Sequence, residues 1–244
     1  MLNNDNVRLT NLRTLEFVAI KLGDIRKDVV FLGGGITGLF ISDPAVPDIR
    51  YTFDVDCIVD VISLHQYHQL EKKLIQQGFK KSLAEEVICR WFYDSVILDI
   101  MPTDEKILGF GNRWYKQAIA SSIIYSLNDK LQIRIVTAPY FLATKFEAFR
   151  TRGKMDLYAS HDFEDIVSVL DGRLEIVPEI KDADITLKEY LINSLQGVMK
   201  HPSFKGAMPG HFVQYGRLAN ERIELFERKL ASIWSNEYET SVGN

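Results

Sequence analysis

Cysteine and long apolar runs are scarce in this chain. Among its 244 residues there are two cysteines, Cys57 and Cys89, which provide neither a disulfide framework nor the paired spacing of a zinc site. No apolar run is long enough to cross a bilayer, and the first residues lack the charged start and apolar core of a signal peptide. We therefore expect a cytoplasmic protein without a membrane partner.

A strong excess of charge of one sign is also missing. The formal net charge is -4 at pH 7, so no global basic field argues for nucleic acid, although a local basic groove is compatible with it. The chain contains no internal repeat and no low-complexity segment. Its apolar content of 46% is ordinary for a globular protein, and the length suits one large domain or a domain with an appended helical part.

The most informative stretch begins with the apolar residues 29–32, which run into the glycine-rich segment 33–38. This pattern predicts a short buried strand followed by a glycine turn. A second predicted strand, residues 51–59, contains Asp54 and Asp56. Because side chains alternate across a strand, the two carboxylates point to the same side. There they repel each other unless a cation lies between them.

A third acid, Asp99, stands among apolar residues in the predicted strand 96–101, which follows a predicted turn at residues 94–95 and stops at Pro102. An acid inside an otherwise buried strand is costly unless it is paired or binds a metal. Carboxylates and substrate phosphates are the ligands with which proteins usually bind Mg²⁺. The residues therefore predict a site for Mg²⁺ (or Mn²⁺) on these strands, and a glycine turn that holds the phosphates of a nucleotide.

The glycine turn has two competing interpretations. Gly33, Gly35 and Gly38 match the G-x-G-x-x-G pattern of a dinucleotide site, which requires a full crossover helix after the glycines. The prolines in segment 43–47 interrupt any such helix after barely two turns. The other alternative is a glycine turn without a ligand.

Three further segments carry both a functional and a structural interpretation. His65 and His68 lie one turn apart on a predicted helix, but two histidines without a third ligand nearby are more often surface residues. In segment 108–115 an aromatic ring such as Trp114 could stack on a base, or simply pack a turn. The basic loop 149–154 could contact phosphates or an RNA acceptor, although a solvated connection is slightly favoured.

After residue 173 the composition changes. Residues 187–199 and 217–234 are predicted as amphipathic helices. We therefore divide the chain into a catalytic domain, residues 1–173, and a helical C-terminal region, residues 174–244. No catalytic constellation is visible in the second part, which could cap a nucleotide cleft or bind an acceptor.

The motifs together resemble a known superfamily. Leu-Gly-Gly-Gly at 32–35, Thr52-x-Asp54-x-Asp56, and Leu-Asp-Ile-Met-Pro at 98–102 are similar to the motifs of nucleotidyltransferases with the polymerase-β-like fold. Within that superfamily the chain most resembles the bacterial AbiEii/AbiGii toxin-type nucleotidyltransferases, over roughly residues 29 to 172. The resemblance implies an α+β fold, in which a mixed β-sheet has flanking helices and a helical C-terminal part.

The resemblance also implies catalytic roles. Asp54 and Asp56 would bind the metal, and Asp99 would bind a second metal or act as base. Lys145, on the predicted helix 138–150, matches the lysine that contacts the nucleotide. The segment 160–166 matches a later acidic motif and points to Asp162, and less closely to Asp165.

The residue pattern gives a second account of that acidic motif. Asp162 and Asp165 fall in the first turn of a predicted helix capped by Ser160, where negative charge is favourable in any case. Helix capping therefore competes with a catalytic role for Asp162. The family's glycine turn often carries a serine after a glycine, and here the nearest hydroxyl is that of Thr37. The nucleotide-binding residues implied by the resemblance are Gly33, Gly34, Gly35, Thr37, Thr52, Lys145 and Asp162.

The reaction implied by the resemblance is transfer of an NMP from an NTP to an acceptor hydroxyl, on an RNA 3′ end or a protein. Similarity to toxin-type enzymes adds an antitoxin as an expected partner. Two other classes stay open at this point. One is a nucleotide-binding module without turnover, such as the regulatory half of a toxin–antitoxin pair. The other is a phosphotransferase that moves the γ-phosphate.

Overall fold

The computed structural model describes residues 5–46, 49–81 and 88–235. Within these residues, six strands form one mixed sheet with the order β3-β4-β2-β1-β6-β5. The strands are β1 (Val29–Leu32), β2 (Asp54–Val59), β3 (Arg90–Tyr93), β4 (Val96–Pro102), β5 (Ile123–Asn128) and β6 (Leu131–Ile135). The fold is α+β, a mixed sheet with flanking helices, as the sequence predicts.

The connection between β1 and β2 decides whether the glycine turn belongs to a dinucleotide-binding unit. The two strands are antiparallel neighbours, and the chain leaves β1 through a short 3₁₀ helix, η2 (Gly34–Phe40). A dinucleotide-binding unit needs two parallel strands joined by a crossover helix. The glycines therefore do not belong to such a unit. On its other side β2 pairs in parallel with β4, so that β2 has partners on both edges.

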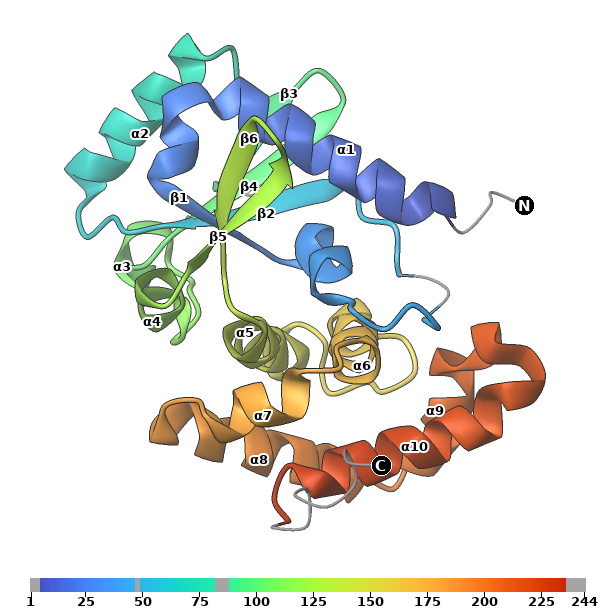
Figure 1. The fold of residues 1–244 in the computed structure, drawn as a ribbon. Helices are drawn as coiled ribbons and strands as arrows, with labels where there is room; N and C mark the ends of the chain where they lie inside the picture. The colour runs from blue at the N-terminus through green and yellow to red at the C-terminus, as the bar shows by residue number, and fades with distance from the viewer. Residues whose placement is uncertain (1–4, 47–48, 82–87, 236–244) are drawn as a thin grey trace.

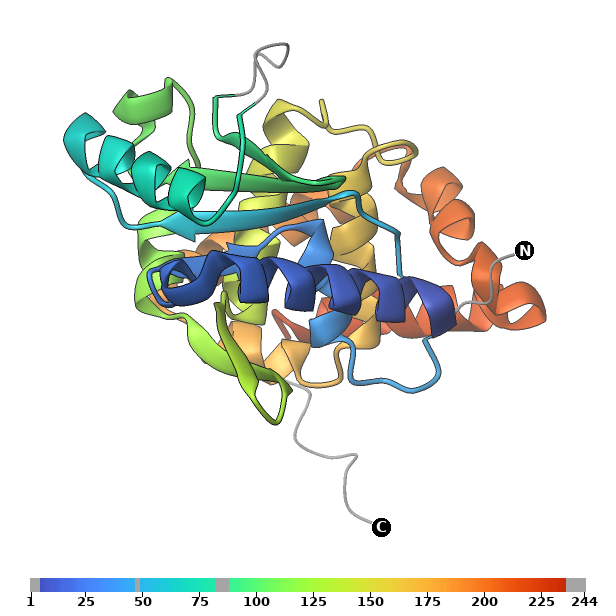
Figure 2. The same ribbon diagram turned by 90° about the horizontal axis from the view of Figure 1, so that it is seen from above.

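Helices cover both faces of the sheet (Figure 1). On one side lie α1 (Asp5–Leu22) and α2 (Leu64–Gln76), and on the other lie α5 (Ala138–Thr151) and α6 (His161–Gly172). Figure 2 shows α1 running across its face of the sheet. The chain also forms η1 (Gly23–Lys27), α3 (Glu105–Leu108) and α4 (Tyr115–Ala120).

The C-terminal helices form an outer layer on α5 and α6, away from the sheet (Figure 1). They are α7 (Ile176–Lys181), α8 (Ile185–Met199), α9 (Phe204–His211), the 3₁₀ helix η3 (Val213–Leu218) and α10 (Ala219–Ser232). A continuous cluster of buried apolar side chains extends from α1 and the sheet to Leu191 of α8 and Phe226 of α10. The core therefore crosses the position, 173, where the sequence suggests a boundary.

Local signals place the ends of several elements. The Ser63 hydroxyl accepts a hydrogen bond from the Gln66 amide and begins α2, and Gly78, with φ of 93°, follows its end. Asp94 adopts φ of 52° in the turn between β3 and β4, where aspartate is tolerated better than most residues. None of the helices in the described ranges has both the length and the apolar character needed to span a membrane.

Candidate functional site

Three carboxylates meet on the neighbouring strands β2 and β4. Asp54 and Asp56 project from β2, and the parallel register places Asp99 of β4 beside Asp56. One carboxylate oxygen of each residue lies within 4.8 Å of the other two. We call these residues the acidic triad. The structure thus brings together the three acids that the sequence singled out, on the face of the sheet opposite the buried Val55 and Cys57.

Gly33 makes room for one of these acids. Its φ of 75° and ψ of -171° lie in a region that only glycine adopts readily. A Cβ atom on Gly33 would lie 1.9 Å from Oδ2 of Asp56. Glycine is therefore required at position 33 for a steric reason that is independent of any ligand, because the backbone passes directly against the Asp56 carboxylate.

The three carboxylates differ in their hydrogen bonds. The Thr52 hydroxyl donates to Oδ1 of Asp54 over 2.8 Å. Arg90 donates to both oxygens of Asp99, from Nε over 2.9 Å and from Nη2 over 2.8 Å. No hydrogen bond among the described residues reaches the carboxylate of Asp56. Burial, together with the negative charge of Asp54, raises the pKa of Asp56 to about 7.

Sequence reasoning missed Arg90, although the hairpin contains the information. A turn at residues 94–95 pairs Tyr93 with Val96, and the same register then pairs Arg90 with Asp99. Counting outward from the predicted turn would therefore have placed this arginine beside the third acid, since cross-strand partners lie close together in an antiparallel pair.

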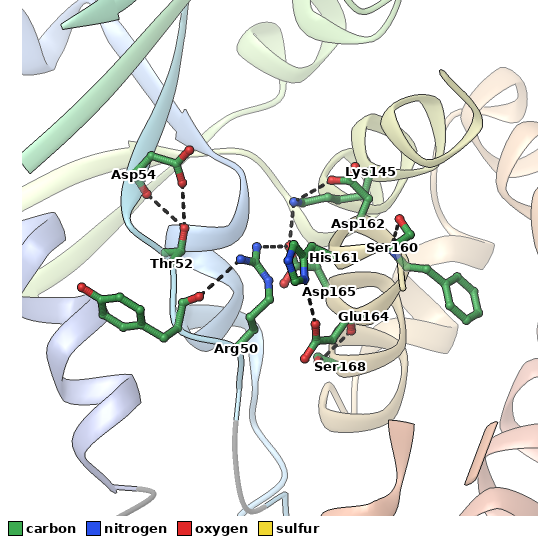
Figure 3. A network of polar contacts seen from close by, with 12 residues as sticks. Arg50, Thr52, Asp54, Lys145, Ser160, His161, Asp162, Glu164, Asp165 and Ser168 are labelled. Carbon is green, nitrogen blue, oxygen red and sulfur yellow. Dashed lines mark hydrogen bonds and ion pairs between the residues drawn. The ribbon is translucent and has the colours of Figure 1, made fainter. Parts of the chain in front are cut away.

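A buried group of charges on α5 and α6 lies across from Asp54 of the triad (Figure 3). Lys145 of α5 lies with its Nζ 2.7 Å from Oδ2 of Asp165 and 3.1 Å from Oδ1 of Asp162. All three side chains are buried. Burial alone would lower the pKa of Lys145, but Asp165 and Asp162 outweigh it and raise that pKa. The lysine therefore carries its charge inside the protein.

Two arginines complete this group. Arg152 donates to both oxygens of Asp162, each over 2.8 Å, while most of its own side chain remains exposed. Arg50, from the segment before β2, donates to Oδ2 of Asp165 over 3.1 Å. Burial opposes ionisation of Asp162, but the hydrogen bonds from Arg152 and the charge of Lys145 lower its pKa to about 2. We call these five residues the cation–carboxylate cluster.

The competing account of the α6 acids is also visible. The hydroxyl of Ser160 accepts a hydrogen bond from the amide of Phe163 over 3.4 Å and caps the helix, as predicted. Asp162 and Asp165 do lie in the early part of α6, yet their carboxylates bind Lys145 rather than the helix end. Ser160 therefore provides the cap, and the two acids hold the buried lysine.

A cavity of about 600 Å³ separates the triad from the cluster. The triad and Arg90 line the part formed by the sheet, whereas Lys145 lines it from α5 and Arg152 and Lys154 line it from the loop between α5 and α6. The residues around it are Gly34, Arg50, Asp54, Asp56, Arg90, Asp99, Lys145, Arg152, Gly153, Lys154, Asp156, Ala159, Ser160, His161 and Asp162. The cavity thus offers ligands for a cation on one side and for phosphate oxygens on the other.

Not every predicted nucleotide contact reaches this cavity. Gly34 lines it, but Gly33, Gly35, Thr37 and Thr52 do not. Thr37 is 1% exposed and belongs to the core side of η2, which leaves its hydroxyl away from the cavity. The glycine turn therefore presents one residue to a ligand in this structure, rather than the whole cradle that the resemblance implies.

The aromatic segment, the histidines and the basic loop also differ in whether they reach the cavity. Trp114 is buried, and the guanidinium of Arg113 lies 5.0 Å from its ring centre, so this ring packs the fold and is not open to a base. His68 is exposed and pairs with Glu71 over 2.6 Å. By contrast, Arg152 and Lys154 of the basic loop do line the cavity, which favours the functional interpretation of that loop.

No protein-family model matches the chain, and a search of curated proteins finds no match. The case for a function therefore rests on the geometry of the cavity and on the motif resemblance.

Proposed function

We propose that this protein is a divalent-metal-dependent nucleotidyltransferase that moves an NMP from an NTP to an acceptor hydroxyl. The observation that carries the proposal is the acidic triad facing the cation–carboxylate cluster across one cavity. A metal–nucleotide complex has the matching pair of surfaces, since the ion requires oxygen ligands and the phosphates require cations.

The donor set fits such an ion. The triad offers carboxylate oxygens from Asp54, Asp56 and Asp99 within 4.8 Å of one another, and oxygen ligands suit Mg²⁺ and Mn²⁺. Asp56 and Asp54 would hold the ion, because the first has no hydrogen-bond partner among the described residues and the second uses one oxygen for Thr52. A bound ion would neutralise phosphate charge and make the α-phosphate more electrophilic.

The cationic side of the cavity would hold the triphosphate. Arg152 and Lys154 present exposed side chains on the loop that follows α5, and a guanidinium can bind two phosphate oxygens at once. Lys145 is held in one position by Asp162 and Asp165. Because its charge is already placed, it would stabilise negative charge that develops on the phosphates without moving.

The reaction then consists of one displacement. The acceptor oxygen forms a bond to the α-phosphorus while the bond from that phosphorus to the pyrophosphate oxygen breaks. Pyrophosphate leaves with the bonding electron pair, and the acceptor hydroxyl loses its proton to solvent water in the cavity. Similarity to the toxin-type enzymes supports an RNA 3′ end or a protein as acceptor, and an antitoxin as partner.

Label transfer tests this function. The protein is incubated with Mg²⁺ and each NTP, labelled at the α- or the γ-phosphate, together with total cellular RNA and protein. We expect α-label to appear on a macromolecule, and Asp54→Asn to abolish that transfer. Asp94→Asn is the matched control, because Asp94 is exposed, lies in a turn away from the cavity and has a φ that asparagine also adopts. Full transfer by Asp54→Asn would contradict the mechanism, and transfer of γ-label alone would indicate a phosphotransferase.

One observation favours a second candidate, a nucleotide-binding module without turnover. Both oxygens of Asp99 already accept hydrogen bonds from Arg90, which makes this acid a poorer metal ligand or base. Nucleotide binding without any label transfer would support this candidate. Absence of both binding and transfer would contradict both functions.

A further inference from the structure

The position of Arg90 bears on how many metal ions the triad can hold. Its Nη2 lies 2.8 Å from Oδ2 of Asp99 and 3.8 Å from Oδ2 of Asp54. An ion that bridged Asp54 and Asp99 would have to lie in the same region. In the structure a guanidinium nitrogen therefore stands between the two carboxylates that a second metal would share.

The pairing of Arg90 with Asp99 resists displacement. The two parallel hydrogen bonds form a fork, which is the strongest common geometry for an arginine and a carboxylate. Asp99 is 7% exposed, and removing the partner of a buried charge is strongly unfavourable. Both residues are also held by the antiparallel register of β3 and β4. We therefore expect the Arg90–Asp99 ion pair to remain formed when a metal binds to Asp54 and Asp56.

The charges in the triad lead to the same conclusion. When all three carboxylates are ionised they carry three negative charges, and Arg90 offsets one of them. The remainder matches the charge of one divalent ion. Asp56 and Asp54 have oxygens that no arginine nitrogen among the described residues approaches within hydrogen-bonding distance, so the ion has a defined place.

We propose that the triad is a one-metal site, in which Asp54 and Asp56 hold the ion and the Arg90–Asp99 pair takes the place of a second cation. This inference rests on the metal site of the proposed function. Asp99 is then a positioning residue, which holds the Arg90 guanidinium at the cavity wall. Arg90 supplies a fixed positive charge to the phosphates where a two-metal enzyme would use an ion.

Counting bound Mn²⁺ tests the inference without measuring activity. The full-length protein without nucleotide is titrated with Mn²⁺, and the free ion is followed by electron paramagnetic resonance. We expect one Mn²⁺ per chain. The decisive variant is Arg90→Met with Asp99→Asn, which removes both partners and leaves the net charge of the triad unchanged. It should still bind one Mn²⁺ with a dissociation constant within about threefold of the unmodified value, because the net charge beside the ion is unchanged.

Two reference variants calibrate this result. Asp54→Asn removes a ligand and should weaken Mn²⁺ by at least about tenfold, the loss that even outer partners of a metal site can cause. Asp94→Asn should leave binding unchanged. The single variant Arg90→Met frees Asp99 and should admit a second ion. If that variant does not fold, the double variant still decides, because it removes the charge of Asp99 together with that of Arg90.

Two results would overturn the inference. One is two Mn²⁺ per chain in the unmodified protein, and the other is a loss of affinity in the double variant as large as that of Asp54→Asn, which would make Asp99 a ligand. Failure of the proposed function is distinguishable. One Mn²⁺ per chain without label transfer would reject the transferase and keep the one-metal site, whereas no Mn²⁺ at all would reject the metal site itself.

Discussion

Gly33 and Asp56 are in direct contact, since the space that a Cβ atom of Gly33 would fill lies 1.9 Å from Oδ2 of Asp56. Gly33 directly follows β1, and Leu32, the last residue of that strand, pairs with Asp56 across the sheet. Any side chain at position 33 would push away the carboxylate that has no hydrogen bond of its own among the described residues. The glycine turn and the acidic triad are therefore one structural unit.

This contact makes Gly33→Ala a sharp test of the triad. The substitution should displace the Asp56 carboxylate and weaken Mn²⁺ by more than about tenfold, the loss seen when support of a metal ligand is removed. Backbone strain should also lower the free energy of unfolding by about 1–3 kcal/mol. Gly109→Ala is the control, because Gly109 has φ of +78° but no atom within 4 Å of its Cβ position. Normal Mn²⁺ binding by Gly33→Ala would show that Asp56 is not a ligand.

Lys145→Met should destabilise the protein strongly. The change leaves Asp162 and Asp165 without the cation between them, and breaking a buried ion pair costs about 3–5 kcal/mol. Urea unfolding of the two proteins measures the difference. Lys116→Met is the comparison, since Lys116 is exposed on α4 and its loss should change stability by less than about 0.5 kcal/mol. Equal stability of the two variants would mean that Lys145 is not held as an ion in the cluster.

The raised pKa of Asp56 predicts how stability depends on pH without metal. The folded protein keeps a proton on Asp56 up to about pH 7, whereas an unfolded chain releases it near pH 4. The folded state therefore binds more protons in this window, and the free energy of unfolding contributed by Asp56 falls as pH rises from about 4 to about 7. Thermal melting of Asp56→Asn should lack this component.

Metal should reverse that trend. Below about pH 7 an ion must displace the proton on Asp56, and above it the carboxylate is already ionised. The rise in melting temperature caused by Mg²⁺ should therefore be larger at pH 8 than at pH 6. The same rise at both values would show that Asp56 does not titrate with the metal.

The attachment of the C-terminal helices gives a prediction remote from the cavity. Arg222 of α10 donates to Asp171 at the end of α6 and to Asp43 near η2, each over 2.7 Å. Arg222→Met would leave both carboxylates without this partner and should cost about 3 kcal/mol of stability. Exposed Arg217 provides the control Arg217→Met. Mn²⁺ binding should survive both changes, and a loss of binding in Arg222→Met alone would mean that α10 supports the triad.

Much of the fold follows from local patterns. The apolar runs at β1 and β4, the turn at Asp94 and the cap at Ser160 all lie where the sequence predicts them. These features depend on neighbours within a few residues, through side-chain alternation, turn geometry and capping. The pairing of Asp54 with Asp56 on one face belongs to the same class.

Local patterns do not predict which groups far apart in the chain pair with each other, or which side chains become buried. Arg50 binds Asp165 across 115 positions of sequence, and Thr37, the expected phosphate contact, is 1% exposed. Which face of η2 enters the core depends on how α1 and α6 pack around it, and no local pattern contains that information. Arg90 is intermediate, because the hairpin register that aligns it with Asp99 is local, whereas the position of this pair beside Asp54 and Asp56 depends on the pairing of β2 with β4.

The sequence by itself determined that two acids share a face of one strand, that a third acid interrupts another, and that glycines precede them. Those statements follow from the period of a strand and from the cost of burying a carboxylate. Only the tertiary structure decided that Asp99 is paired with Arg90, that Lys145 lies between two acids, and that one cavity separates the triad from the cation–carboxylate cluster. Electrostatic roles depend on distances between groups far apart in the chain, and packing alone sets those distances.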